Sequence, residues 1–260
     1  RPGDEEQPIL EADLPSDQAM LPRVDFATGD SWAKIAEQYE QLVEKNIDTE
    51  AVQGLAKAAI AGAEDDSDKM QRILDQLQSL VRYTGIEFGE AAIVPGKPKK
   101  TLARRYGDCK DQSVLLVSML RSVGIEAHVA LLRAGPGEDV SPDLPALNAF
   151  DHVIVYVPGD DPKWIDPTAK FTPVGELPLD DQGRRALIVK AGTKELVQTP
   201  RAPSSANVQE LTREYTLRRW AKSDVVYQFE ATGLFAVLER AHYAEQTAAQ
   251  TRLAWQQFGT

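Results

Sequence analysis

The chain has 260 residues, of which 42% are hydrophobic and 27% charged, so it can form one substantial globular core plus a smaller unit. Its net charge of −11 argues against a nucleic-acid partner, because phosphate backbones are bound by basic patches. The single cysteine excludes an internal disulfide and a cysteine-based metal cluster, and no apolar run reaches the roughly 18–20 residues of a membrane span.

Residues 1–29 are rich in proline and acidic residues and show little hydrophobic periodicity. This composition predicts an extended linker or the tail of a preceding domain. The chain begins with Arg1 rather than Met and shows no signal peptide. We therefore expect it to be processed or to be part of a longer protein.

Three amphipathic helices are predicted between residues 30 and 81, because apolar residues recur there at i, i+3, i+4 and i+7. Thr49 is expected to cap the second helix, and Asp66 or Ser67 the third. We interpret all three as packing helices.

The most informative stretch is 106–112, with the sequence YGDCKDQ, which runs into a helix that Gly124 is expected to end. Cys109, the lone cysteine, falls in the first turn of this helix, directly after Asp108, a good N-cap. The unpaired N–H groups and the positive end of the helix dipole favour a thiolate there. Nearby cations should add to this effect, and they lie at positions 97, 99, 100, 104, 105 and 110.

Cys109 could instead be a small buried hydrophobe, which is the common role of a lone cysteine. A position flanked by Asp108 and Lys110 suits that role less well. We predict that Cys109 is a nucleophile, and that Gly107 leaves room for a substrate backbone.

A thiol nucleophile needs a base, and the base needs an orienting group. His152 begins the β-branched run 152–157, which a five-residue turn separates from a second short strand ending before Asp166. If Val157 faces Lys163 across this turn, His152 and Asp166 share one face of the sheet. Asp166 would then hold the imidazole in the tautomer that accepts a thiol proton, whereas a slip of one residue would separate them.

The other two histidines are weaker candidates. We expect His128 on a partly exposed strand without an acidic strand close behind it, and His242 as a surface or packing residue of a terminal helix. A site of histidines and carboxylates for a metal is disfavoured, because the chain has no His-x₃-His pair. We expect neither a metal nor a cofactor.

Four motifs follow one another: Gly-Asp-Cys-Lys-Asp at 107–111, Gly-Ile-Glu-Ala at 124–127, Phe-Asp-His-Val at 150–153 and Trp-Ile-Asp-Pro-Thr at 164–168. In this order and spacing they resemble the bacterial branch of the transglutaminase-like superfamily, which shares the papain-like cysteine-protease fold. The resemblance covers roughly residues 30–200. It implies an α+β fold with helices packed on an antiparallel sheet, in which Cys109 is the nucleophile, His152 the base and Asp166 the orienting acid.

The resemblance leaves the substrate class open. Lys110 follows the nucleophile where cross-linking transglutaminases and papain-like proteases carry an aromatic residue. Relatives also place a side chain ahead of the cysteine helix at the oxyanion hole, a role that the phenol of Tyr83 could fill beside Gly107 and Asp108. Core packing is the alternative for Tyr83. The resemblance further implies a periplasmic or extracellular protein in which this core follows an all-β domain.

The rest of the chain predicts a cleft wall at 171–183, a last core strand at 185–189 and a boundary at 192–206. Residues 207–260 predict a β-β-α segment with one helix from about Leu234 to Phe258. Such a unit exposes too much apolar edge to be complete, so we expect the beginning of a further, truncated domain.

The leading hypothesis is thiol-dependent acyl transfer on an amide or peptide bond of a protein or peptide substrate, with release to water or to an amine. The alternative is a non-catalytic binding or scaffold module that keeps the fold. The presence of Cys109, His152 and Asp166 together argues against this alternative, because each could be lost without harm to the fold.

Overall fold

The structure is a computed structural model that describes residues 24–85, 88–220, 222–244 and 246–258. By their contacts the residues form two compact units. The first comprises the described residues up to Thr168 together with Pro173–Pro200, and the second Ala169–Thr172 and the described residues from Arg201 on. Most of the linker predicted at 1–29 lies outside the described residues. Among the described helices, none is long and apolar enough to cross a membrane.

Three amphipathic helices open the first unit, as predicted: α1 (Trp32–Glu44), α2 (Thr49–Ala59) and α3 (Asp66–Leu80). Their N-caps are Ser31, Asp48 and Asp65, whose side chains each accept a backbone N–H of the first turn. The caps predicted at Thr49 and at Asp66 or Ser67 are therefore wrong. An aspartate precedes each of these positions, and its carboxylate is the acceptor.

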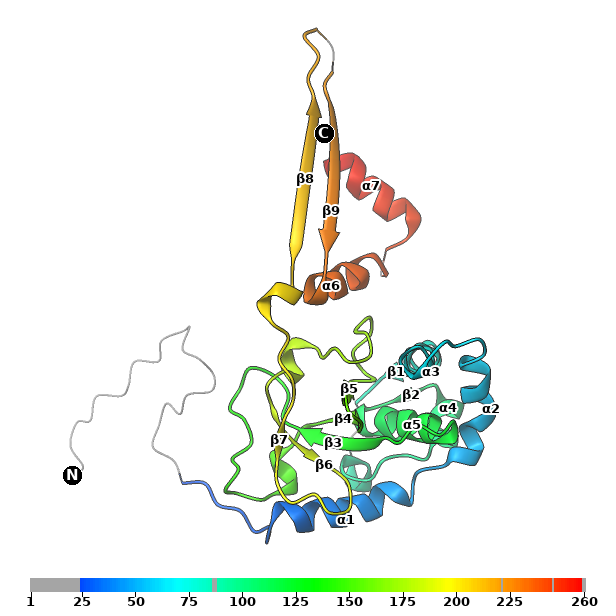
Figure 1. The fold of residues 1–260 in the computed structure, drawn as a ribbon, viewed down its shortest axis with the longest axis vertical. Helices are drawn as coiled ribbons and strands as arrows, with labels where there is room; N and C mark the ends of the chain where they lie inside the picture. Colours follow the sequence, from blue (N-terminus) through cyan, green and yellow to red (C-terminus); the bar gives the residue numbers. More distant parts are fainter. Residues whose placement is uncertain (1–23, 86–87, 221, 245, 259–260) are drawn as a thin grey trace, which may run out of the picture. The chain divides into compact units, whose positions relative to one another are not determined.

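The central helix α5 (Cys109–Ser122) is buried from Cys109 to Leu120. It packs against the sheet on one side and against α2 and α3 on the other (Figure 1). Gly124 follows it with a φ of 88°, a conformation that glycine adopts at little cost, and ends the helix as predicted.

A five-stranded antiparallel sheet forms the other layer, with the strand order β5-β4-β3-β6-β7. Its strands are β3 (His128–Leu132), β4 (His152–Val157), β5 (Lys163–Ile165), β6 (Arg185–Ile188) and β7 (Val197–Gln198). The strand β7 lies inside the segment predicted as a boundary. Two residues are too few to show a period of two, so the sequence pattern missed it.

Short elements complete the first unit. The strands β1 (Arg82–Tyr83) and β2 (Tyr106–Gly107) form a separate parallel pair, and α4 (Pro98–Arg104) lies between them in sequence. Three 3₁₀ helices are η1 (Gly89–Ala92), η2 (Leu147–Ala149) and η3 (Leu179–Asp181).

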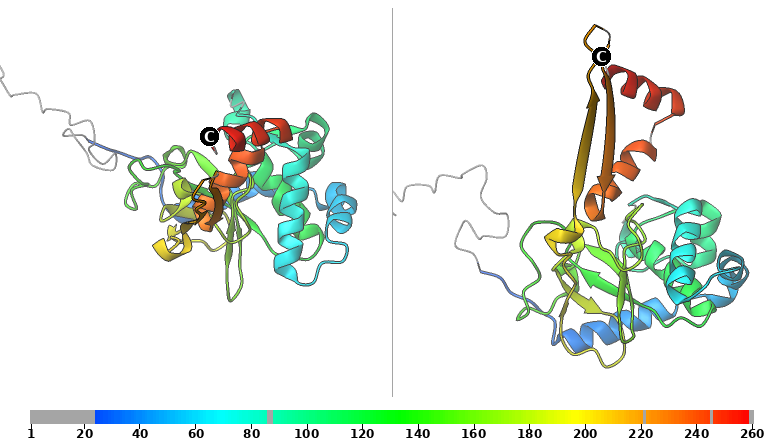
Figure 2. Two further views of the ribbon diagram at one scale, coloured as in Figure 1. Left: turned by 90° about the horizontal axis from the view of Figure 1, so that it is seen from above. Right: turned by 45° about the horizontal axis from the view of Figure 1, so that its top comes forward.

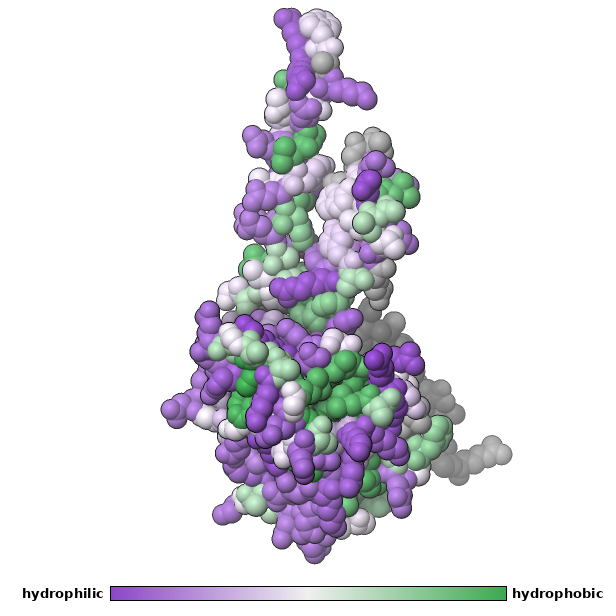
Figure 3. Space-filling view, turned by 90° about the vertical axis from the view of Figure 1, so that its right-hand side faces the viewer, coloured by the Kyte–Doolittle hydropathy of each residue, from purple (hydrophilic) through white to green (hydrophobic). Residues whose placement is uncertain are grey.

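In the second unit the 3₁₀ helix η4 (Ser204–Ala206) is followed by an antiparallel hairpin of β8 (Gln209–Thr216) and β9 (Asp224–Ala231). Two helices follow, α6 (Gly233–Ala244) and α7 (Ala248–Phe258), and Figure 2 shows them along one side of the hairpin. Many apolar side chains of this unit are exposed, and they appear in green along the hairpin in Figure 3. That this unit is the beginning of a further domain stays a prediction.

The single helix predicted from Leu234 to Phe258 is wrong, because the structure has two helices there. Thr247 starts the second one: its hydroxyl accepts the N–H of Gln250, and its carbonyl accepts the N–H of Thr251. This is the pattern of an N-cap threonine, which interrupts one helix and begins another.

Candidate active site

Cys109 is the first residue of α5, where a capping box fixes the backbone. The Asp108 carboxylate accepts the N–H of Asp111 at 3.1 Å, and the Asp111 carboxylate accepts the N–H of Asp108 at 3.3 Å. The Cys109 side chain is 4% exposed. The predicted first-turn position is present, and it places the thiol beside backbone N–H groups that lack an intrahelical partner.

Asp111 also holds the loop before Cys109 in place. Its carboxylate binds the Arg104 guanidinium and accepts the N–H of Gly96. A Cβ on Gly107 would lie 2.8 Å from the Cβ of Asp111 and 3.1 Å from Cγ2 of Thr101. Glycine is therefore needed at 107 for packing inside the protein, and the predicted role of leaving room for a substrate backbone is not the reason for it.

His152 and Asp166 lie side by side at the other wall of the site. The predicted hairpin register is confirmed, with Val157 opposite Lys163 and Tyr156 opposite Trp164. His152 begins β4, Asp166 directly follows β5, and His152 Nε2 lies 3.2 Å from Asp166 Oδ2. The other oxygen of Asp166 accepts the backbone N–H of Thr168 at 2.8 Å and its hydroxyl at 2.7 Å. Asp166 is thus held in the orientation that faces the imidazole.

The electrostatics of this pair favour a charged imidazole. Burial by itself lowers the pKa of His152, but hydrogen bonds with Asp166 and Cys109 and the charges of Asp166 and Asp181 outweigh it and raise the pKa to about 11. Burial likewise opposes ionisation of Asp166, yet its bonds with His152 and Thr168 lower its pKa. A cationic His152 between Cys109 and an anionic Asp166 follows from these shifts.

Cys109 and His152 line one cavity of about 590 Å³. Most of its wall is apolar, with contributions from α1, from residues 92–93 and from residues 146–153: Ile35, Tyr39, Ala92, Ile93, Leu131, Ala146, Leu147, Phe150 and Val153. The Cys109 thiol therefore faces a space that can accept a substrate with apolar side chains near its reacting carbonyl.

The cations that the sequence analysis placed around Cys109 do not gather at this cavity. Lys97, Lys99 and Lys100 are exposed at the start of α4, and Arg104 is bound to Asp111. Lys110 does line the cavity, but its ammonium is paired with the buried carboxylate of Asp108. Burial raises the pKa of Asp108, although the hydrogen bond from Lys110 opposes this shift. The predicted cationic support of the thiolate is therefore not the arrangement seen.

Tyr83 does not occupy the place expected of an oxyanion-hole residue. Its backbone pairs with Gly107, but its side chain is 54% exposed and does not line the cavity. Core packing, the alternative for Tyr83, is wrong for the same reason. Gly107 and Asp108 serve the loop and the helix cap and do not line the cavity either.

A different tyrosine lies in the cavity. Tyr39 of α1 is 4% exposed and its hydroxyl donates to the carbonyl of Ile93 at 3.0 Å. Burial, followed by the negative charges of Cys109, Asp108 and Asp111, raises the pKa of its phenol, so the hydroxyl stays protonated. The sequence shows Tyr39 only as one member of an apolar helix stripe, which is why it was classed with the packing residues.

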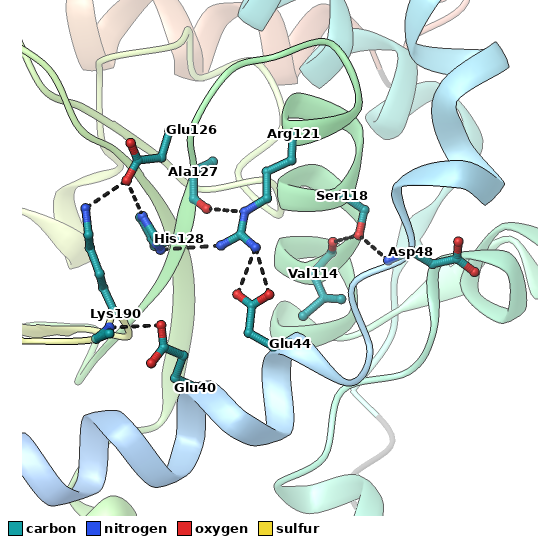
Figure 4. Close-up of polar contacts among 11 residues, drawn as sticks. Glu40, Glu44, Asp48, Val114, Ser118, Arg121, Glu126, Ala127, His128 and Lys190 are labelled. Atoms are coloured by element: carbon teal, nitrogen blue, oxygen red, sulfur yellow. Dashed lines mark hydrogen bonds and ion pairs between the residues drawn. The ribbon is translucent and has the colours of Figure 1, made fainter.

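His128 lies outside the cavity of Cys109 and takes part in a separate polar network. It is 8% exposed, so the partly exposed face predicted for it is wrong. Its Nε2 lies 2.9 Å from a carboxylate oxygen of Glu126, which Lys190 also contacts, and its Nδ1 lies 3.4 Å from Arg121 (Figure 4). Arg121 in turn binds Glu44 of α1. This network joins α1, α5 and β3 and does not line the cavity of Cys109.

One buried acid at the site is not evident from the sequence. Asp181, the last residue of η3, is 1% exposed, and its Oδ2 lies 3.9 Å from His152 Nε2. The sequence shows two adjacent aspartates in a loop, and nothing in that pattern tells that one of them is buried.

Residues 53–167 match the model of the transglutaminase-like superfamily, and this part of the chain is a transglutaminase-like domain. The match includes Cys109, His152 and Asp166. No curated protein matches the chain.

Two solved structures are similar to the chain, and the first of them supports the fold. A putative protease from Parabacteroides distasonis superimposes with a TM-score of 0.52 at 17% identity, over 68% of this chain and 32% of that one. A putative cysteine protease from Cytophaga hutchinsonii gives a TM-score of 0.39 at 15% identity, over 75% of this chain and 53% of that one. The chain thus spans about a third of the first structure's length and about half of the second's. The predicted α+β fold of the transglutaminase-like type is confirmed.

Proposed function

We propose that this protein is a thiol-dependent acyl-transfer enzyme that acts on amide or peptide bonds through Cys109, His152 and Asp166. The observation that carries the proposal is a single arrangement. An imidazole bonded to a buried, oriented carboxylate shares one cavity with a cysteine at a helix N-terminus. The match to the transglutaminase-like superfamily and the fold shared with one putative protease support it.

In this proposal the Cys109 sulfur attacks the carbonyl carbon of a bound amide, while the thiol proton resides on His152. The developing oxyanion is met by the backbone N–H of Cys109 at the helix N-terminus. His152 then gives its proton to the departing amine, the C–N bond breaks and a thioester remains on Cys109. Water or a second amine attacks this thioester with His152 as the base, which releases the acid or the new amide and restores the thiol. Asp166 orients the imidazole and stabilises its cation throughout.

The cavity supports a protein or peptide substrate rather than a small polar metabolite. Its wall is mostly apolar, and the ammonium of Lys110 is already paired with Asp108. We expect the residue next to the reacting carbonyl to carry an apolar or aromatic side chain. A periplasmic or extracellular location stays a prediction from the resemblance.

The proposal is tested with a panel of peptides that carry an electrophilic carbon at the position of the reacting amide. Mass spectrometry should find one adduct per chain on Cys109, formed fastest with peptides that are apolar beside the electrophile. Cys109→Ser should give no adduct and no turnover of the matching amide. Labelling that occurs only after unfolding would favour the scaffold module instead.

A further inference from the structure

Asp181 is a buried carboxyl that the proposed mechanism does not use. It is 1% exposed, and its Oδ2 makes no hydrogen bond among the residues that the structure describes. An ionised carboxylate without partners is costly in such a place, because burial removes the water that would solvate it. A buried carboxyl of this kind is therefore stable only beside a group of opposite charge or in its protonated form.

The position of Asp181 provides the charge partner. Its Oδ2 lies 3.9 Å from Nε2 of His152, the same nitrogen that lies 3.2 Å from Asp166. Two carboxyls thus face one edge of the imidazole, and they come from different elements, η3 and the end of β5. The backbone of Asp181 is fixed as well, since its carbonyl accepts the Thr199 hydroxyl at 2.6 Å and its N–H donates to Pro178 at 3.0 Å.

We propose that Asp181 is a second positioning acid for His152. When protonated, it donates its proton to the Asp166 carboxylate as a hydrogen bond. When ionised, it releases that proton to solvent and becomes a second anion behind the imidazolium. The idea rests on the proposed function for the role of His152 as the base, but the contact between the two residues does not depend on turnover.

The charges around Asp181 place this change near neutral pH. Burial raises its pKa most, the anionic Asp166 raises it further, cationic His152 lowers it, and neighbouring Asp180 raises it slightly, with a result of about 7. Below this pH the proton lies between the two acids, and the imidazolium faces one negative charge. Above it the imidazolium faces two, which strengthens its hold on the proton it receives from Cys109.

The direct test is a titration of the His152 imidazole by NMR in Cys109→Ala protein, so that neither the thiol nor turnover contributes. We expect a step near pH 7 from Asp181 in addition to the titration of the imidazole itself. Asp181→Asn should remove this step and lower the pKa of His152 by about one unit or more, because a full charge about 4 Å away is lost. Asp180→Asn, which changes the exposed neighbour on the same 3₁₀ helix, should leave both features in place.

The second readout is the pH profile of amide turnover. Wild-type kcat should show a step near pH 7, where Asp181 changes its charge, and Asp181→Asn should lose this step with little change in KM. Asp180→Asn should match the wild type. If Asp181→Asn does not fold, Asp181→Ser is the substitute, and its spectrum reports on the fold before any titration.

The outcomes separate the two claims. An unchanged His152 titration in Asp181→Asn overturns the role of Asp181, even if Cys109 and His152 prove essential for turnover. A protein without turnover that still shows the titration change keeps the role of Asp181 and loses the proposed function. Activity that a chelator abolishes and Zn²⁺ restores would mean that a cation occupies the space among these acids, and would also overturn the proposal.

Discussion

The hydroxyl of Ser113 donates a hydrogen bond to the carbonyl of Val153 at 2.9 Å and so joins α5 to β4. Ser113 lies one helical turn after Cys109, and Val153 directly follows His152. Both groups are buried. This buried polar contact joins the two elements close to the thiol and the imidazole, whose relative position the proposed proton transfer depends on.

Ser113→Ala should lower both stability and turnover. The change leaves the Val153 carbonyl without its buried partner, which costs about 1–3 kcal/mol of the free energy of unfolding. It also frees α5 to shift against β4, so we expect kcat to fall roughly tenfold or more at temperatures where the variant is fully folded. Urea unfolding and steady-state kinetics measure the two effects.

Ser118→Ala is the matched control on the same helix. Ser118 is equally buried, and its hydroxyl donates to Val114 at 2.8 Å and accepts the N–H of Asp48 at 3.2 Å (Figure 4). Its loss should cost a similar free energy but leave kcat of the folded protein unchanged. Equal kcat losses in both variants would mean that the bond between Ser113 and Val153 has no special role in placing the site.

Gly107→Ala should destabilise the loop before Cys109. The added Cβ would lie 2.8 Å from the Cβ of Asp111, whose carboxylate completes the helix cap and holds Arg104. Overpacking of this kind costs about 1–3 kcal/mol. Gly54→Ala in the middle of α2 has no atom within 4 Å of its new Cβ and should instead stabilise the chain by about 0.5–1 kcal/mol. Thermal melts in which Gly107→Ala has a higher Tm than Gly54→Ala would contradict the packing role given to Gly107.

The stability of the chain should fall as pH rises above neutrality because of His152. Its pKa is raised from 6.5 to about 11, so the folded protein keeps a proton that the unfolded chain loses between these values. The stabilisation is complete below pH 6.5 and is lost toward pH 11, at up to about 1.4 kcal/mol per pH unit. Urea unfolding at several pH values should show this decline in the wild type and a flatter profile in His152→Gln. Equal slopes would show that His152 is not paired as described, and exposed His242→Gln serves as the control.

Asp166→Asn should lower turnover without unfolding the protein. An amide at 166 keeps the size and the contacts with Thr168, but it no longer stabilises an imidazolium or fixes its tautomer. We expect kcat to fall by roughly 10²–10⁴ while the protein stays folded. The pH dependence of stability at acid pH should change too. In the wild type the lowered pKa of Asp166 adds stability near neutral pH, and this stability is lost as the pH falls through the folded-state pKa. Asp166→Asn lacks this contribution. A variant with nearly normal kcat would remove Asp166 from the mechanism.

The parts of the fold that the sequence predicted are those set by local rules. Asp108 and Gly124 mark the two ends of α5 by capping preferences, and both ends are confirmed. The register of β4 and β5 followed from the length of one turn together with the period of two along a strand. These rules were sufficient to predict that His152 and Asp166 lie on one sheet face.

Features that depend on long-range packing were not predictable in this way. Burial of Asp181 is decided by the path of η3 beside β4, and the two adjacent aspartates look alike in sequence. The exposure of Tyr83 and the burial of Tyr39 show the same limit, since an aromatic side chain fits either a core or a cavity wall. The sequence predicted that Lys110 supports a thiolate at Cys109, but its ammonium is paired with Asp108. A count of nearby cations does not tell which of them are already neutralised.

The most direct test of the mechanism is the rate at which iodoacetamide alkylates Cys109 in native protein at neutral pH. We predict that native Cys109 reacts faster than the same residue in the unfolded chain, because His152 takes up the thiol proton. His152→Ala should lower this rate by more than Lys110→Ala does, because the Lys110 ammonium is already bound to Asp108. A native rate no higher than that of the unfolded chain, together with no effect of His152→Ala, would contradict the mechanism and favour a non-catalytic module.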